Sequence, residues 1–320
     1  MRLMLGFCFA LATPAAADVA DALNTVILPG YAGFATATAA LDQAAQADCA
    51  PEGLQDEWNA AFDAWMRVGF LRLGPGEGEG RNLAIAFWPD PKGLGAKAQA
   101  GMLKSGEIPA EFGEVSVAAR GLFGLERLLY PQDAIFKAEA ACRLIRATTA
   151  DLARMAAELS AEWPPYAARM QAPGAVGETE FLTEAEVKRA LLTALVTGVE
   201  FQKDSRLGRP LGDFDRPRPE RAEARASGRS ARNVDLSLRA LRDLTAALAP
   251  EAAVTLAALD KAIATAEGLD DPVFAGVAEP GSRLKVEILQ QQVTAAKDAM
   301  MAELVPALGV GTGFNAADGD

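Results

Sequence analysis

One carboxylate in this sequence stands where a charged side chain needs a partner. Glu126 lies in the segment from Gly113 to Tyr130, which we predict to be helical. On a helical wheel of about 100° per residue its neighbours are all apolar or amphipathic, namely Val115, Ala119, Leu122, Phe123, Leu129 and Tyr130. Such a carboxylate is costly unless it is paired, protonated or bound to a cation. Glu126 is therefore either a buried structural residue or a site ligand, and we expect it to face the other half of the protein.

A cluster of arginines is the second feature that could bind a ligand. Eight arginines and four acidic residues fall between Arg206 and Arg232. Arg221, Arg225 and Arg229 recur at four-residue steps, a like-charge stripe that would destabilise a helix. Arginine forks suit carboxylate and phosphate groups. The cluster is either a solvated basic surface or an anion site, with a polyuronate, haem propionates or the chain's own Asp318 and Asp320 as candidate anions.

The composition excludes several kinds of chemistry. The chain has no histidine, which rules out Ser-His-Asp and Cys-His catalysis and every His-ligated metal site. A net charge of -12 argues against nucleic acid as a partner. The glycine-rich stretch from Gly74 to Gly80 lacks a following GK[ST], and its two glutamates would repel phosphate. We therefore do not expect nucleotide binding.

The elements that position these residues are predicted to be helices, so the fold class is all-α. Alternating β-branched segments are missing, and strands therefore have little support. Alanine-rich apolar stripes suit closely packed helical bundles. Apolar residues at three- and four-residue steps, or alanine-rich composition, indicate helices over residues 18–47, 52–71, 135–163, 181–206, 234–248 and 284–302.

The chain is predicted to consist of a leader and two halves. Residues 1–17 combine a positive start, an apolar run and a small-residue cleavage site, as a secretory signal peptide does. No later stretch reaches the roughly 20 apolar residues of a membrane helix, so we expect a periplasmic protein without a membrane span. The proline- and glycine-containing stretch from Gln171 to Glu180 reads as a linker. We therefore expect an N-terminal bundle of residues 18–172 and a C-terminal bundle with a tail, residues 173–320.

Export would leave an even number of cysteines. Cleavage removes Cys8, and the mature chain then carries only Cys49 and Cys142. In an oxidising compartment such a pair forms a disulfide or remains as two buried thiols. We predict the disulfide, which would join the first interhelical turn to the long helix.

Several motifs resemble those of the imelysin family. The run from Gly121 to Tyr130, GLFGLERLLY, is similar to the family's signature helix, whose motif is GxHxxE followed by two leucines and an aromatic residue. Trp58 and Trp65, followed by RLGP at residues 72–75 and WPD at residues 88–90, resemble the family's order of motifs, and residues 313–320 resemble its tail. Phe123 stands where the family has its histidine.

The resemblance implies a periplasmic or envelope protein of two helical bundles, linked to iron regulation or uptake, with a site in the cleft between them. Without the histidine, a cation would need oxygen ligands, which fits ferric iron, calcium or magnesium better than zinc or copper. The expected ligands are Glu126, Asp90 and Asp318. The residues expected to line the site are Gly121, Phe123, Trp65, Arg72, Trp88 and Arg120.

Two functions follow as expectations. The first is a binding protein for iron or another oxygen-ligated cation. The alternative is a non-catalytic interaction module that docks an anionic ligand or a periplasmic or inner-membrane protein. The family is named as a peptidase, but this chain has no HExxH motif, so we do not expect an enzyme.

Overall fold

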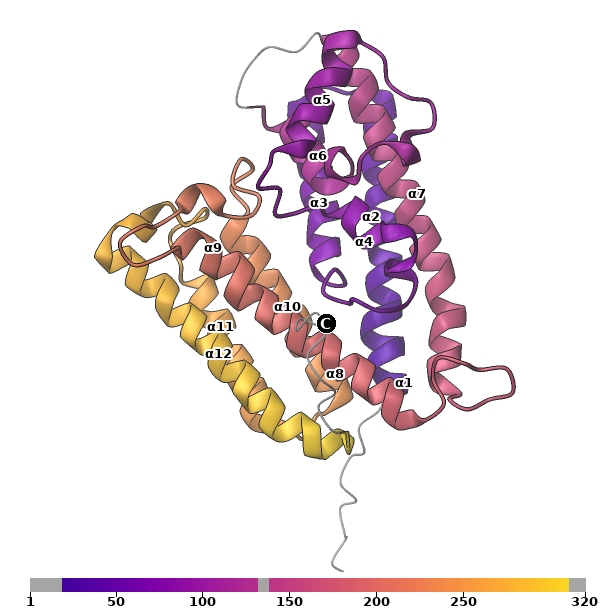
Figure 1. The fold of residues 1–320 in the computed structure, drawn as a ribbon, viewed down its shortest axis with the longest axis vertical. Coiled ribbons are helices and arrows are strands. Elements are labelled where there is room, and N and C mark those ends of the chain that lie inside the picture. Colours follow the sequence, from indigo (N-terminus) through magenta and orange to yellow (C-terminus); the bar gives the residue numbers. More distant parts are fainter. Residues whose placement is uncertain (1–18, 132–137, 311–320) are drawn as a thin grey trace, which may run out of the picture.

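A computed structural model of the protein describes residues 19–131 and 138–310 (Figure 1). Over these ranges the chain forms helices and no β-strand, so the all-α prediction is confirmed. The predicted signal peptide and Asp318 lie outside the described residues. In the described part of the chain, no helix combines the length and the apolar character that crossing a membrane requires.

The N-terminal group of helices is built around two long helices that lie side by side. α2 (Leu28–Ala47) packs along α7 (Ala138–Gln171) and against α3 (Gln55–Met66). Their core is aromatic, with Tyr31 stacked on Trp163 at 4.9 Å between ring centroids. The smaller elements of this group are α1 (Val19–Asp21), a π-helical turn η1 (Ala22–Ile27), α4 (Arg81–Ile85), α5 (Leu94–Ser105) and α6 (Gly121–Leu129).

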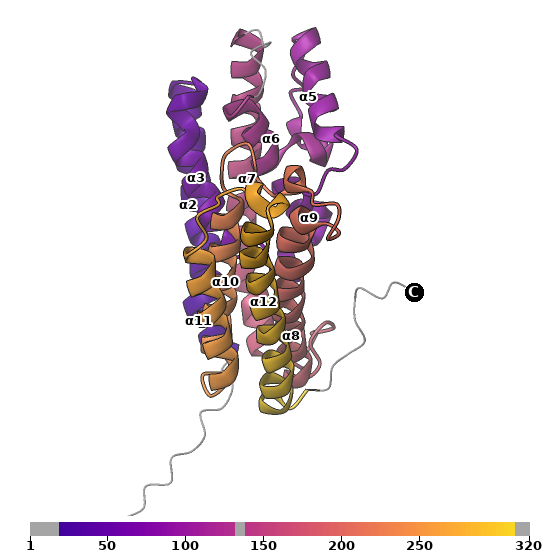
Figure 2. The same cartoon turned by 90° about the vertical axis from the view of Figure 1, so that its left-hand side faces the viewer.

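The C-terminal group is a second bundle, tilted against the first in Figure 1 and seen from its outer side in Figure 2. It contains α8 (Glu184–Glu200), α9 (Gly208–Leu211), α10 (Ser230–Leu248), α11 (Ala253–Glu267) and α12 (Pro280–Leu308). A capping box between Thr183 and Glu186 begins α8, which is a favourable start because it satisfies orphan backbone donors. α8 continues into a π-helical turn, η7 (Phe201–Leu207).

The two groups meet along α10, which packs against α8 in its own group and against α3 and η1 in the other. Gly198 lies in this seam. A Cβ atom there would come within 2.7 Å of Leu241 Cδ2 and 3.2 Å of Phe70 Cβ. The absence of a side chain at Gly198 therefore lets α8 approach the N-terminal group closely.

The predicted disulfide between Cys49 and Cys142 is present, with 5.3 Å between the Cα atoms. It joins the turn that follows α2 to the first turns of α7, as expected from the sequence. The bond therefore closes a loop that contains α3, α4, α5 and α6 within the N-terminal group.

The prediction of one helix from Gly113 to Tyr130 was wrong in its first half. Short 3₁₀ turns occupy Phe112–Glu114 and Val117–Ala119, and α6 begins only at Gly121. The reason is local: Arg120 is extended, and Gly121 has a φ of 64°, which separates α6 from the preceding turn. A Cβ atom at Gly121 would also lie 2.2 Å from the carbonyl oxygens of Ala84 and Ile85.

Candidate functional site

The Glu126 carboxylate lies at the interface between the two groups of helices. It is buried on α6, and its Oε1 accepts hydrogen bonds from the backbone N of Ser227 at 3.0 Å and from Ser227 Oγ at 2.7 Å. Burial raises the pKa of Glu126, and the two hydrogen bonds from Ser227 offset this only in part. Glu126 therefore faces the C-terminal group as predicted, and its partner there is the polar side chain of Ser227.

Ser227 belongs to a loop that we call the arginine loop, residues 219–229. Glu223 fixes this loop: its carboxylate accepts from Arg206 Nε at 2.6 Å, Arg206 Nη2 at 3.2 Å and Asn233 Nδ2 at 3.0 Å. Ser230 Oγ donates to the Glu223 carbonyl oxygen at 2.5 Å. Both charges of the pair between Arg206 and Glu223 are buried, so the pair holds the loop on η7 at defined positions.

Arg229 ends the arginine loop and has a structural role. Its guanidinium donates to Asp63 Oδ1 and to Asn59 Oδ1, both at 2.6 Å, and lies 4.7 Å from the centre of the Phe62 ring. Arg232 donates to the same Asp63 carboxylate. Arg229 is only 2% exposed, and its guanidinium is already hydrogen-bonded to these partners. It is therefore not available to bind the anion that the sequence suggested.

Several of the predicted residues meet in what we call the arginine cavity, of about 510 Å³. Glu126, Asp90 and Phe123 line it from the N-terminal group, together with Arg127 and Trp88. From the C-terminal group it is lined by Arg209 on α9 and by Glu220, Arg221 and Arg225 of the arginine loop. The structure thus brings the predicted carboxylates Glu126 and Asp90 into one cavity with two of the predicted anion-binding arginines.

The donor set of this cavity fits a bare cation poorly. Asp90 accepts from the backbone N of Leu94 at 2.9 Å and of Gly95 at 2.8 Å, so it caps α5. Burial opposes ionisation of Asp90, but these backbone donors and Arg127 outweigh it and lower its pKa. Across residues 19–131 and 138–310, no three or more acidic or cysteine side chains are grouped so that they could hold a metal ion. The third expected ligand, Asp318, lies outside the described residues.

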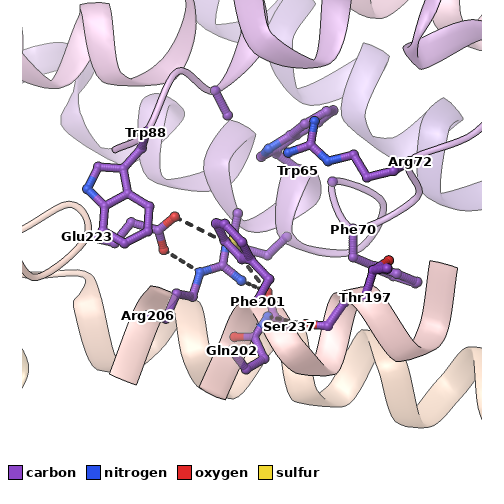
Figure 3. Close-up of a pocket in the computed structure, with 14 residues that line it drawn as sticks. Trp65, Phe70, Arg72, Trp88, Thr197, Phe201, Gln202, Arg206, Glu223 and Ser237 are labelled. Atoms are coloured by element: carbon purple, nitrogen blue, oxygen red, sulfur yellow. Dashed lines mark hydrogen bonds and ion pairs between the residues drawn. The ribbon is translucent and has the colours of Figure 1, made fainter. Parts of the chain in front are cut away.

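A second cavity lies on the other side of Trp88, and we call it the tryptophan cavity. It has a volume of about 180 Å³ and is lined by both groups of helices (Figure 3). Trp65, Phe70, Arg72 and Trp88 come from the N-terminal group. Thr197, Phe201, Gln202, Arg206, Glu223 and Ser237 come from the other. Trp88 lines both cavities and meets Phe201 of the tryptophan cavity edge to face at 6.0 Å between ring centroids.

Polar groups without a protein partner line the tryptophan cavity. Gln202 is fully buried, and its Oε1 atom has no hydrogen-bond donor within the described residues. Across the same residues Arg72 makes no side-chain hydrogen bond and no ion pair, and the Trp65 indole N–H donates to no acceptor. Removal of water by the surrounding protein lowers the pKa of Arg72, and the Arg206 charge lowers it further against the opposing Glu77 charge. The cavity therefore offers two donors and one acceptor to a ligand.

Two residues expected to line the site lie elsewhere. Arg120 forms a buried, two-pronged ion pair with Asp151, with Nε at 2.8 Å from Oδ2 and Nη2 at 2.9 Å from Oδ1. Arg120 therefore anchors the start of α6 to α7. Gly121 packs against the backbone of α4. Neither residue lines the arginine cavity or the tryptophan cavity.

Sequence reasoning missed most of the C-terminal contribution to the site. Arg206 and Arg209 belong to the arginine-rich stretch, but no four-residue spacing marked them. Phe201 and Gln202 begin the π-helical turn η7, and such turns occur frequently at functional sites. A break of helical periodicity after Glu200 is the signal that could have identified them.

Comparisons with known proteins agree with this architecture. The sequence model of the family described as imelysin (Peptidase M75) matches residues 27–300. Iron-regulated protein A of Synechococcus elongatus is 24% identical over an alignment of 315 residues, which covers 89% of this chain and 84% of that protein.

Two solved structures have a similar fold. An imelysin-like protein from Psychrobacter arcticum has a TM-score of 0.76 at 22% identity, covering 94% of this chain and 100% of that one. A protein described as an iron-regulated protein A precursor from Parabacteroides distasonis has a TM-score of 0.72 at 14% identity, covering 92% and 97%. At these identities the two structures support the fold alone.

Proposed function

Because this chain belongs to the imelysin family, we propose that it is a periplasmic binding protein with an iron-related role, whose ligand occupies the tryptophan cavity. The observation that carries the proposal is the set of unpartnered polar groups in a cavity between two helical groups. Buried polar groups normally have hydrogen-bond partners, so the buried Gln202 and Trp65 side chains, left open toward a cavity, mark a place for a ligand. Arg72 is exposed to solvent and adds a charged donor to them.

The relatives support the iron-related part of the proposal. The Synechococcus relative is named iron-regulated protein A, and the Parabacteroides structure is described as a precursor of such a protein. The word precursor agrees with the signal-peptide pattern in residues 1–17 of this chain. Binding without catalysis is the function we propose, since the sequence has neither a histidine nor an HExxH motif.

The chemistry of the cavity favours an organic anion over a bare cation. Arg72 has no ion-pair partner among the described residues, while the charges of Arg206 and Glu223, which both line the cavity, offset each other. A free cation would be repelled by Arg72, whereas a carboxylate would accept its hydrogen bonds. Trp65 and Trp88 provide apolar walls for the carbon skeleton of the ligand. Iron would then arrive as an anionic chelate.

Calorimetric titration of the full mature chain tests this proposal, with ferric citrate, iron-free citrate, calcium and zinc as probes. We expect ferric citrate to bind and the bare cations to bind weakly. Arg72→Gln should weaken ferric citrate binding at least tenfold. Arg189→Gln is the matched control, since Arg189 is an exposed arginine on α8 that lines neither cavity.

Two outcomes would contradict the proposal. One is equal affinity of wild type and Arg72→Gln for ferric citrate. The other is strong binding of a bare cation that Glu126→Gln abolishes, which would favour the oxygen-ligated cation site at Glu126 and Asp90 instead.

A non-catalytic interaction module is the second candidate, and one observation favours it. Phe123, at the position of the family's histidine, is 4% exposed and meets Phe62 edge to face at 5.4 Å. The residue therefore serves packing and has no lone pair to offer a metal. Absence of binding by every probe in the titration would favour this candidate.

A further inference from the structure

Three arginines of the arginine cavity have no acidic partner. The guanidinium groups of Arg209, Arg221 and Arg225 make no hydrogen bond and no ion pair within the described part of the chain. Arg209 Nε is buried without an acceptor, and the guanidinium lies 5.6 Å from the centre of the Trp88 ring. The aromatic ring holds Arg209 in place but does not neutralise its charge.

Two of these charges, on Arg209 and Arg221, also repel each other. Burial lowers the pKa of Arg209, and the charge of Arg221 lowers it further. A lowered pKa means that the positive charge on Arg209, next to that on Arg221, raises the free energy of the folded state. An anion between them would remove this cost, because each guanidinium would gain a charged acceptor.

The acidic residues of the cavity do not fill that role. The Asp90 carboxylate caps α5, and Glu126 accepts from Ser227 and has a raised pKa. The Glu220 carboxylate lies 3.8 Å from Arg218 Nη1 and is exposed. The fourth arginine of the cavity, Arg127, already donates to Gln99 Oε1 at 2.9 Å and to the Ala118 carbonyl at 2.6 Å. Three free cationic forks therefore remain.

We propose that the arginine cavity binds a small oxyanion that carries two or more negative charges. Arg221 and Arg225 on the arginine loop and Arg209 on α9 are its donors. The shared chemistry is that of carboxylate and phosphate groups, which match the guanidinium fork. The proposal is independent of ligand binding in the tryptophan cavity, because the donors are different residues on the other side of Trp88.

The fixed loop supports a preformed site. Glu223 and Arg229, on either side of Arg225, are buried and hydrogen-bonded to Arg206 and Asp63 respectively. Ser227 is held by Glu126. The loop backbone is therefore tied at three places, and binding would need to order only the side chains of Arg221 and Arg225.

Calorimetry of the full mature chain tests the proposal, with citrate and pyrophosphate as the two multivalent probes and acetate as the monovalent one. We expect citrate or pyrophosphate to bind with an affinity that falls as sodium chloride is raised, and acetate to bind at least tenfold more weakly. The double variant Arg221→Gln/Arg225→Gln should weaken the multivalent probe at least tenfold. Tighter binding of citrate would identify the ligand as a carboxylate compound, and tighter binding of pyrophosphate would identify it as a phosphate compound.

The matched control is Arg189→Gln/Arg216→Gln, which removes the same charge from two exposed arginines that line neither cavity. It should bind as the wild type does. Because Arg221 and Arg225 are exposed, their variant should keep the wild-type melting temperature. Equal weakening in both double variants, or no binding of either multivalent probe by the wild type, would overturn the proposal. Loss of binding in Arg72→Gln alone would also overturn it, because the anion would then occupy the tryptophan cavity.

Discussion

Ser227 donates two hydrogen bonds to the same oxygen of Glu126, one from its backbone N at 3.0 Å and one from its hydroxyl at 2.7 Å. The contact joins α6 of the N-terminal group to the arginine loop of the C-terminal group. It places a buried carboxylate at the wall of a cavity that is also lined by three arginines without an ion-pair partner in the described part of the chain. The same small region therefore contributes to stability and lines the cavity that we propose for an anion.

Glu126→Gln should stabilise the protein at neutral pH. The raised pKa means that the folded state binds the Glu126 proton more tightly than the unfolded state does. Its stabilising contribution is therefore complete below the ordinary glutamate pKa and is lost as pH rises through the folded-state value. Glutamine removes the ionisation and keeps an oxygen for Ser227. We expect a higher melting temperature than wild type at pH 7, and a difference that shrinks toward pH 4.

Melting curves at several pH values measure this effect. Glu107→Gln is the control, since Glu107 is exposed and its side chain has no partner among the described residues. A Glu126→Gln variant that is less stable than wild type at pH 7 would show that the ionised carboxylate is required for the fold.

Arg206→Met should be strongly destabilising. The Arg206 and Glu223 side chains are buried, and removal of one charge leaves the other without a partner. Breaking a buried pair in this way costs about 3–5 kcal/mol. Urea unfolding gives the free energy. The double variant Arg206→Met/Glu223→Leu should recover part of the loss, and a single-variant cost under about 1 kcal/mol would contradict the structural role of the pair.

Loss of the disulfide should lower the free energy of unfolding by about 2–4 kcal/mol, because the bond limits the unfolded chain across a long loop. The variant Cys49→Ser/Cys142→Ser shows this in urea unfolding. Wild-type protein unfolded under reducing conditions should behave like the variant. Two free thiols in denatured, unreduced wild-type protein would contradict the bond.

Gly121→Ala should cost about 2–4 kcal/mol. The residue has a positive φ, and a Cβ atom would meet the carbonyl oxygens of Ala84 and Ile85 at 2.2 Å. Gly101→Ala is the matched control in α5, because a Cβ atom there meets nothing within 4 Å and alanine favours the helix. We expect a small gain in stability from Gly101→Ala, and similar effects of the two variants would contradict the close approach of α6 to α4.

Processing of the leader can be checked directly. We predict that the mature protein begins at Asp18, after the small-residue cleavage site. Intact mass of protein prepared from the periplasm measures this, and a chain that retains Met1 would contradict export by cleavage.

Much of the fold could be predicted from the sequence because helical periodicity is local. The apolar residues between Val234 and Leu248 lie on one face of α10, and those between Leu284 and Ala302 belong to α12. The helix that contains Glu126 was predicted to begin too early. Gly121, with its positive φ, ends the preceding turn, but the pattern of apolar residues does not reveal this break. The disulfide followed from counting cysteines in a chain that we predict to be exported. Glu126 could be identified from the sequence because its neighbours on the helical wheel are apolar, and this does not depend on its tertiary contacts.

Only the tertiary structure decided which charges are free. Arg120, Arg221, Arg225 and Arg229 are the same residue type, yet Arg120 is paired with Asp151 and Arg229 with Asp63, while Arg221 and Arg225 face a cavity. The partner of Glu126 is likewise 101 positions away along the chain. Spacing places side chains on the faces of a single helix. The partner of a charge, in contrast, depends on how separate helices and loops pack, and that is set by contacts between residues far apart in the sequence.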